Sequence, residues 1–158
     1  KQPLLEAHRD QLKPEIVWNI EHGLELTADD IGRAERRRGE MFQDAANFFS
    51  TYDFLVTPAV AAAPFDGEIR YLEEIEGQKF NSYVDWLVLT FAISLLGCPA
   101  ISIPGGFTDE GLPVGLQIVG PPRSEAALLG ASRLFEEAAG LSALVPLDPK
   151  AVPSPVAV

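Results

Sequence analysis

Two short runs of aliphatic and β-branched residues stand out in the hydrophobic pattern of the second half of the chain. They cover residues 100–103 and 114–119, and a segment rich in glycine and proline separates them. Continuous apolar runs of this length are typical of strands buried on both faces of a sheet. Because proline donates no backbone hydrogen bond, Pro104 and Pro121 are predicted to end the two strands.

The N-terminal part of the chain has a helical pattern with recognisable start signals. The pattern of residues 4–26 predicts one broken helix or two short helices. Pro14 would lie in the first turn of the second helix, and Gly23 would end that helix. Thr27 and Asp30 then have the spacing of a capping box, with Asp in place of the usual Glu. We therefore expect a new helix to begin immediately after Thr27.

That helix is predicted to be long and amphipathic and to end near Tyr52, because apolar residues recur at three- and four-residue steps. A short strand at residues 53–57 is expected next, ended by Pro58. Residues 59–79 have no regular pattern. An irregular segment of this length within a compact domain is usually functional or disordered.

Two further helices are predicted downstream. One covers residues 80–96, with Asn81 or Ser82 as its cap, and its second half is apolar nearly all round, which indicates a helix buried against a sheet. The other follows Ser124 and continues to residue 139. The residues expected on its inner face are Leu128, Leu129, Leu134 and Phe135.

The element order is helix, strand, helix, strand, strand, helix, which predicts an α/β fold with helices on both faces of a sheet. The folded segment is expected to cover residues 1–140, and the proline-rich residues 141–158 to be extended or disordered. Three strands make a narrow sheet, whose edges are expected to be exposed. An exposed sheet edge can pair with a strand of another chain.

Charge and cysteine content narrow the function classes. The chain of 158 residues has 12 basic and 23 acidic residues and a net charge of −11, which argues against nucleic acid or an anionic membrane surface as a partner. The one basic cluster, residues 36–38, lies beside Glu35 and Glu40 and is interpreted as a solvated helix face. The apolar run 86–96 is shorter than the roughly 20 residues of a membrane span.

Candidate chemistry within the chain is sparse. Cys98, the only cysteine, is a nucleophile candidate with His8 or His22 as base, but its place between glycine and proline at a strand start favours a small buried thiol. Asp85 is more typical of a helix cap than of an acid–base group. We expect no metal site, because two histidines without clustered carboxylates lack the three or four ligands that a transition metal needs.

Four segments together resemble the amidase signature family. Residues 97–104 (GCPAISIP) and 111–120 (GLPVGLQIVG) look like its C-terminal part, residues 52–58 (YDFLVTP) resemble a family strand, and residues 83–86 (YVDW) resemble a pattern of one branch. The resemblance extends over roughly residues 8–140. It implies that the chain is the C-terminal portion of a large mixed sheet flanked by helices on both faces.

The resemblance also implies an amide hydrolase with a serine nucleophile, a second serine in a cis conformation and a lysine base. All of these belong to the N-terminal and central parts of the family pattern. The lysines here, Lys1, Lys13, Lys79 and Lys150, lie near no matching motif, so no catalytic residue is carried over to this segment. A hydroxyl without a base is a weak nucleophile.

By the same resemblance, the helix before residue 97 lines part of the substrate pocket. The substrate-binding candidates are Phe65, Tyr83, Trp86, Thr90 and Ser94. Many family members have Asn at the position of Ser94. Each assignment has a structural alternative that stays open. For Trp86 it is a place in the core, as for most tryptophans, and for Thr90 and Ser94 it is a hydroxyl that bonds back to the preceding helical turn.

We therefore expect the C-terminal segment of a cytoplasmic, cofactor-free amidase that acts on a small or medium-sized amide and is inactive alone. The chain begins with Lys1 and is expected to be a piece of a longer protein. Its partner would be the upstream part of the same enzyme or a second copy. The alternative is a non-catalytic α/β binding module that self-associates through its open sheet.

Overall fold

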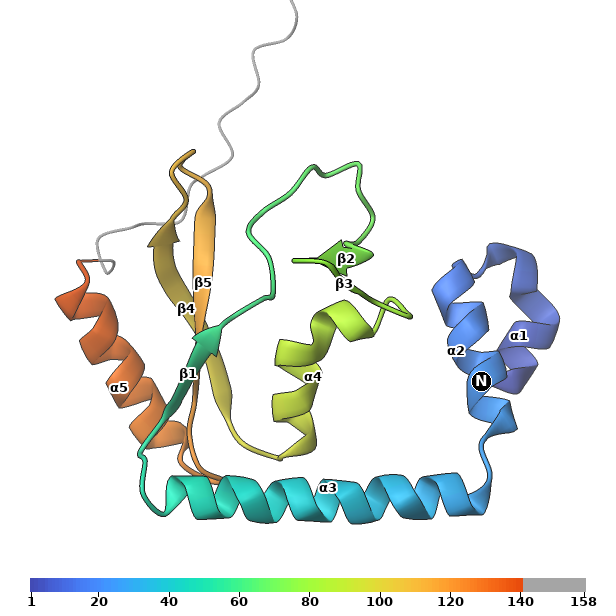
Figure 1. Ribbon diagram of the computed structural model, residues 1–158, viewed down its shortest axis with the longest axis horizontal. Helices are drawn as coiled ribbons and strands as arrows, with labels where there is room; N and C mark the ends of the chain where they lie inside the picture. The colour runs from blue at the N-terminus through green and yellow to red at the C-terminus, as the bar shows by residue number, and fades with distance from the viewer. Residues whose placement is uncertain (141–158) are drawn as a thin grey trace, which may run out of the picture.

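The computed structural model describes residues 1–140, and the predicted tail 141–158 lies outside the described residues. Figure 1 shows a sheet at one end of the molecule, two packed helices at the other, and the long helix α3 connecting them along one side. The two packed helices are α1 (Gln2–His8) and α2 (Pro14–Glu25), joined by a 3-10 turn (Arg9–Gln11), and α3 is Ala28–Phe49.

The start signals of α2 and α3 are confirmed. Pro14 occupies the first turn of α2, whereas Gly23 lies inside α2, which continues to Glu25. At the start of α3 the capping box is complete: the Asp30 N–H donates to Thr27 Oγ1 at 3.2 Å, and the Thr27 N–H donates to the Asp30 carboxylate at 2.9 Å. The hydrogen bonds from the Thr27 side chain and backbone lower the pKa of Asp30.

The described sheet has three antiparallel strands in the order β1-β5-β4. They are β1 (Leu55–Pro58), β4 (Ala100–Phe107) and β5 (Pro113–Val119). β4 continues past Pro104, so the predicted strand end is wrong. The register shifts between Pro104 and Gly106, and this bulge at the sheet edge accommodates a residue without an N–H.

The loop between β1 and the next helix is more ordered than its sequence indicates. Within residues 59–79, which were expected to be irregular, β2 (Glu74–Ile75) pairs with β3 (Gln78–Lys79) as a small hairpin. Its two turn residues, Glu76 and Gly77, both have positive φ, at 51° and 79°. This is the backbone of a tight two-residue hairpin turn, whose twist matches that of its flanking strands.

Helix α5 (Glu125–Ala138) packs on one face of the sheet and forms the core there. Leu128 is 3% exposed and lies in a buried cluster with Ile103 and Ile118. Phe54, Ile101 and Leu116 pack around this cluster. The prediction that Leu129 and Leu134 point inward is wrong, because their exposed fractions are 60% and 67%. Only one stripe of α5 meets the described sheet.

The other face of the sheet meets α4 (Val88–Leu95). Successive residues of a strand point to opposite faces, and Gln117, next to the core residue Ile118, contacts α4 through the carbonyl of Leu89. Figure 1 shows α5 and α4 on opposite sides of the sheet. The predicted α/β class with helices on both faces is therefore confirmed.

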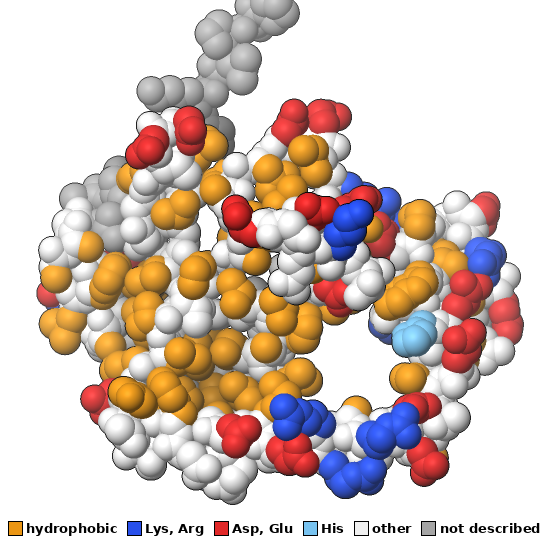
Figure 2. Space-filling view, in the orientation of Figure 1, with side chains coloured by type: hydrophobic (Ala, Val, Ile, Leu, Met, Phe, Trp, Pro, Cys, Tyr) orange, Lys and Arg blue, Asp and Glu red, His pale blue; other side chains and the backbone are white. Residues whose placement is uncertain are grey.

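Much apolar surface stays exposed in the described chain. Figure 2 shows hydrophobic side chains gathered over β1 and α4 beside α3, and an opening through the molecule between α3 and the paired helices. The expected burial of α4 is wrong for most of its residues, since only Ile93 is buried. Exposed large hydrophobic residues on these elements are Ile31, Phe42, Val56, Val88 and Leu95. Within residues 1–140, no helix has the length and apolar character needed to cross a membrane.

Candidate functional site

The candidate site residues cluster around the start of α4, where the chain turns from the β2–β3 hairpin into the helix. The helix begins later than predicted: a 3-10 turn (Asp85–Leu87) precedes α4, and neither Asn81 nor Ser82 caps it. Instead, the Asp85 carboxylate accepts hydrogen bonds from the Asn81 backbone N–H at 2.9 Å and the Ser82 hydroxyl at 3.1 Å. These bonds fold the segment before the helix onto Asp85.

Two of the predicted site residues meet. The rings of Phe65 and Trp86 pack edge to face, with centroids 5.9 Å apart and planes at 71°. Trp86 is half-buried, and its Nε1 is buried without a hydrogen-bond acceptor among the described residues. A buried donor without a partner costs free energy. The pair therefore combines an apolar surface with an unused N–H donor.

Tyr83 lies apart from that pair and packs against another ring. Its centroid is 5.4 Å from that of Tyr71, with the ring planes at 88°. Tyr83 also lines a cavity of about 780 Å³ that α2 borders. The sequence grouped Tyr83 with Trp86 because they are close in the chain, but the structure gives them different neighbours.

The hydroxyls of Thr90 and Ser94 bond back to the preceding helical turn, which is the structural alternative that the sequence left open. Thr90 Oγ1 donates to the Leu87 carbonyl at 2.8 Å, and Ser94 Oγ donates to the Thr90 carbonyl at 3.2 Å. Both residues are exposed on α4. Each hydroxyl oxygen keeps its lone pairs and therefore still has acceptor capacity.

Gln117 is a positioning residue that the sequence analysis missed. It is 7% exposed, and its Nε2 donates at 3.0 Å both to Thr57 Oγ1 and to the Leu89 carbonyl. One side chain on β5 thus holds β1 and α4 together. The sequence did contain a signal for this role: Gln117 is a side-chain amide within an otherwise apolar strand. A buried polar group of this kind needs hydrogen-bond partners.

A cysteine mechanism finds no support in the geometry. Burial raises the pKa of the Cys98 thiol, which lowers the fraction of reactive thiolate near neutral pH. His8 and His22 belong to α1 and α2, which Figure 1 places away from the strand that follows Cys98. Among residues 1–140, no group of three or more His, Cys, Asp and Glu side chains is arranged to hold a metal ion.

Comparison with known proteins identifies related sequences. The Amidase family model matches residues 3–129. An acylamidase of Rhodococcus erythropolis is 35% identical over 132 residues, covering 83% of this chain and 28% of the relative. A fatty acid amide hydrolase of Arabidopsis thaliana is 36% identical over 117 residues, covering 72% of this chain and 19% of the relative. The chain thus spans less than a third of the length of these curated relatives.

A solved structure has the same arrangement of elements. The crystal structure of a bacterial aryl acylamidase that belongs to the amidase signature enzymes superposes with a TM-score of 0.77 at 25% identity. The match covers 91% of this chain and 31% of that chain. Nearly all of the described fold therefore corresponds to one part of a larger enzyme.

Proposed function

The chain belongs to the amidase signature family, and on that premise we propose that residues 1–140 are the C-terminal segment of an amidase that hydrolyses small or medium-sized amides. The observation that carries the proposal is the match of the family model to residues 3–129, in a fold that covers 31% of a solved aryl acylamidase. In this proposal the serine nucleophile, the cis serine and the lysine base belong to the preceding part of the enzyme. No cofactor takes part.

The exposed apolar surface supports a role in completing a larger fold. Val56 on the edge strand β1 is 53% exposed, and further hydrophobic residues are exposed along α3 and α4. Contiguous apolar patches of this kind usually mark an interface. In the proposal, the upstream part of the enzyme covers them and extends the sheet at its open edge.

The segment is also proposed to form part of the amide pocket. Phe65 and Trp86 would supply its apolar wall, and Thr90 and Ser94 would border it. Tyr83 would stand between this pocket and the cavity beside α2, which it also lines. Ligand pockets are lined mainly by apolar and aromatic groups with a few polar ones.

We expect Trp86→Ala in the complete enzyme to change substrate preference. If Trp86 borders the pocket, its loss should shift the ratio of kcat/KM between a bulky and a small amide by about tenfold or more, which is the low end of the effect of one methylene-sized contact. Trp86→Phe is the matched control, because it keeps an aromatic contact with Phe65 and removes the N–H donor together with part of the ring surface. The measurement is kcat/KM for both amides, together with the melting temperature.

The two interpretations of Trp86 give opposite results. A core tryptophan truncated to alanine costs about 3–5 kcal/mol of stability, so a large fall in melting temperature with an unchanged kcat/KM ratio would place Trp86 in the core. A shifted ratio with a nearly unchanged melting temperature supports the pocket.

The coding sequence upstream of Lys1 separates the proposed function from its alternative. The proposal requires a glycine-rich segment with paired serines and a lysine in that sequence. A chain that is expressed without such a segment and sediments as a defined dimer would instead be a self-associating α/β module. The exposed edge strand β1 favours that second candidate.

A further inference from the structure

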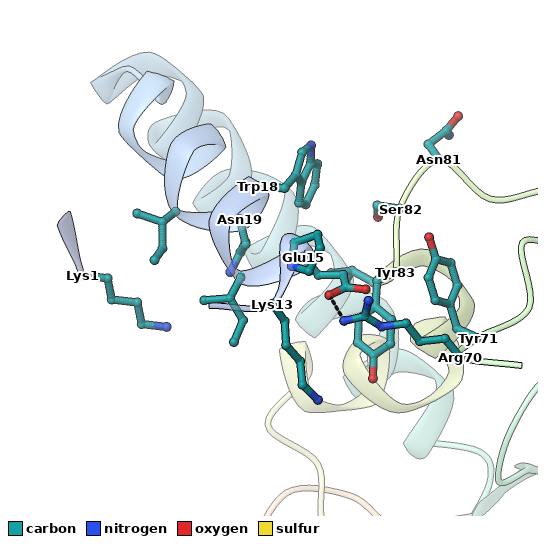
Figure 3. A pocket seen from close by; sticks show the side chains of 14 residues that line it. Lys1, Lys13, Glu15, Trp18, Asn19, Arg70, Tyr71, Asn81, Ser82 and Tyr83 are labelled. Atoms are coloured by element: carbon teal, nitrogen blue, oxygen red, sulfur yellow. Dashed lines mark hydrogen bonds and ion pairs between the residues drawn. The ribbon is translucent and has the colours of Figure 1, made fainter. Parts of the chain in front are cut away.

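The cavity next to Tyr83 is separate from the Phe65–Trp86 pair and has its own chemistry. It lies between α2 and residues 70–84 and has a volume of about 780 Å³, within the usual size of a small-molecule pocket. Figure 3 shows its lining side chains coming from both sides. An ion pair and three aromatic rings give the cavity its chemistry: Glu15, Trp18, Arg70, Tyr71 and Tyr83.

The charges around the cavity contrast with those of the whole chain. The chain has a net charge of −11, yet Lys1, Lys13 and Arg70 line the cavity, and Glu15 is the only acidic residue among the described residues of its lining. Arg70 Nη2 donates to the Glu15 carboxylate across a separation of 55 residues, as Figure 3 shows. The Arg70 side chain remains 49% exposed and Glu15 only 23%. A guanidinium has several N–H donors, so Arg70 retains donors for a second carboxylate.

Aromatic rings form the walls on both sides of this ion pair. Trp18 on α2 is 46% exposed and stacks on His22, with ring centroids 5.3 Å apart and planes at 7°. Opposite it, Tyr71 and Tyr83 pack edge to face. Exposed indole and phenol rings offer flat apolar surface with a polar edge, which suits an aryl group.

The wall opposite α2 is held in place by its own hydrogen bonds. Asp85 binds the Asn81 N–H and the Ser82 hydroxyl, and the Phe80 N–H donates to the Glu73 carbonyl at 2.8 Å. The edge-to-face contact of Tyr71 with Tyr83 connects the two ends of this segment. This wall is therefore ordered before any ligand enters, which lowers the ordering cost of binding.

We propose that this cavity binds a small aromatic carboxylate, with the ring against the aromatic walls and the carboxylate on Arg70. Glu15 then weakens binding, because the ligand carboxylate binds the remaining Arg70 donors beside a carboxylate of the same charge. The inference goes beyond amide hydrolysis and does not depend on it, since its test measures binding alone.

The test uses the fluorescence of Trp18 in the chain with Trp86→Phe, which leaves Trp18 as its one tryptophan. The probes are 4-nitrobenzoate, the neutral isostere 4-nitrobenzamide, and acetate, which has the charge without the ring. We expect saturable quenching by 4-nitrobenzoate and at least about tenfold weaker binding of the amide and of acetate, because each lacks one of the two contacts. The affinity for acetate, which does not quench, is measured by its displacement of 4-nitrobenzoate. Equal affinity for the acid and its amide would overturn the proposal.

Two substitutions distinguish a binding site from a structural ion pair, because they are expected to act in opposite directions. Arg70→Gln should weaken 4-nitrobenzoate binding about tenfold or more, from the loss of a charge-assisted hydrogen bond. Glu15→Gln should strengthen it several-fold, because the competing carboxylate is gone. Arg133→Gln, on the exposed Arg133–Glu137 pair of α5, is the matched control and should change nothing.

If the pair only clamps α2 to residues 70–84, both substitutions should weaken binding equally, and that result would overturn the proposal. Circular dichroism tests whether each variant keeps the helix content of the parent chain. If Arg70→Gln lowers the helix content, the direction of the Glu15→Gln effect decides: tighter binding supports the carboxylate site and weaker binding contradicts it.

Discussion

The purified chain should release no product from simple aryl and aliphatic amides above the rate in buffer. Enzymes accelerate their reactions by roughly a millionfold or more, so the difference from an active amidase is large and easily measured. The physical reason is the lack of an activated nucleophile among the described residues: burial raises the pKa of Cys98, and the histidines lie on α1 and α2. A serine or threonine hydroxyl without a base does not compensate.

Cys98→Ala supplies the control for this prediction. The variant should be as inactive as the parent chain over the same amide panel. Turnover by the parent chain that disappears in Cys98→Ala would contradict the account and establish a cysteine mechanism within this segment.

Leu128→Ala should lower the free energy of unfolding by about 2–5 kcal/mol, the range for emptying a buried leucine site. Leu128 is 3% exposed and joins α5 to Ile103 of β4 and Ile118 of β5, so its loss leaves a cavity where helix and sheet meet. Such a loss is a large share of the stability of an ordinary domain, about 5–15 kcal/mol. Denaturant titration followed by circular dichroism measures it.

Leu134→Ala on the same helix is the matched control. Leu134 is 67% exposed in this chain, so its truncation should change the free energy of unfolding by no more than about 0.5 kcal/mol. Equal effects of the two substitutions would mean that α5 packs on the sheet through a different face.

Local signals in the sequence predicted local structure. The capping box at Thr27 and Asp30 and the proline at the start of α2 are each defined within a few residues, and both are confirmed. Strand ends were harder to predict. Whether a strand ends at Pro104 depends on its pairing with β5, and a bulge between Pro104 and Gly106 allows β4 to continue. The β2–β3 hairpin has only two residues in each strand, too few for an alternating pattern to show.

The parts of the site that the sequence missed depend on distant pairs. Gln117 finds its partners 60 and 28 positions away, at Thr57 and Leu89. The Glu15–Arg70 contact joins residues 55 positions apart. Sequence patterns of helices, strands and turns relate residues only a few positions apart, so they do not predict contacts at such separations. Similarly, the apolar pattern of α5 shows that Leu128 and Leu134 are hydrophobic, but not which of the two the described chain covers.

The central claim is that this segment completes an amide hydrolase whose nucleophile and base precede it. The most direct measurement compares the hydrolysis of one aryl amide by three proteins at equal concentration: the complete enzyme, the same enzyme ending before Lys1, and this chain alone. The account predicts turnover by the complete enzyme, with both parts near the rate in buffer. Full activity of the enzyme that ends before Lys1, or turnover by this chain alone, would contradict it.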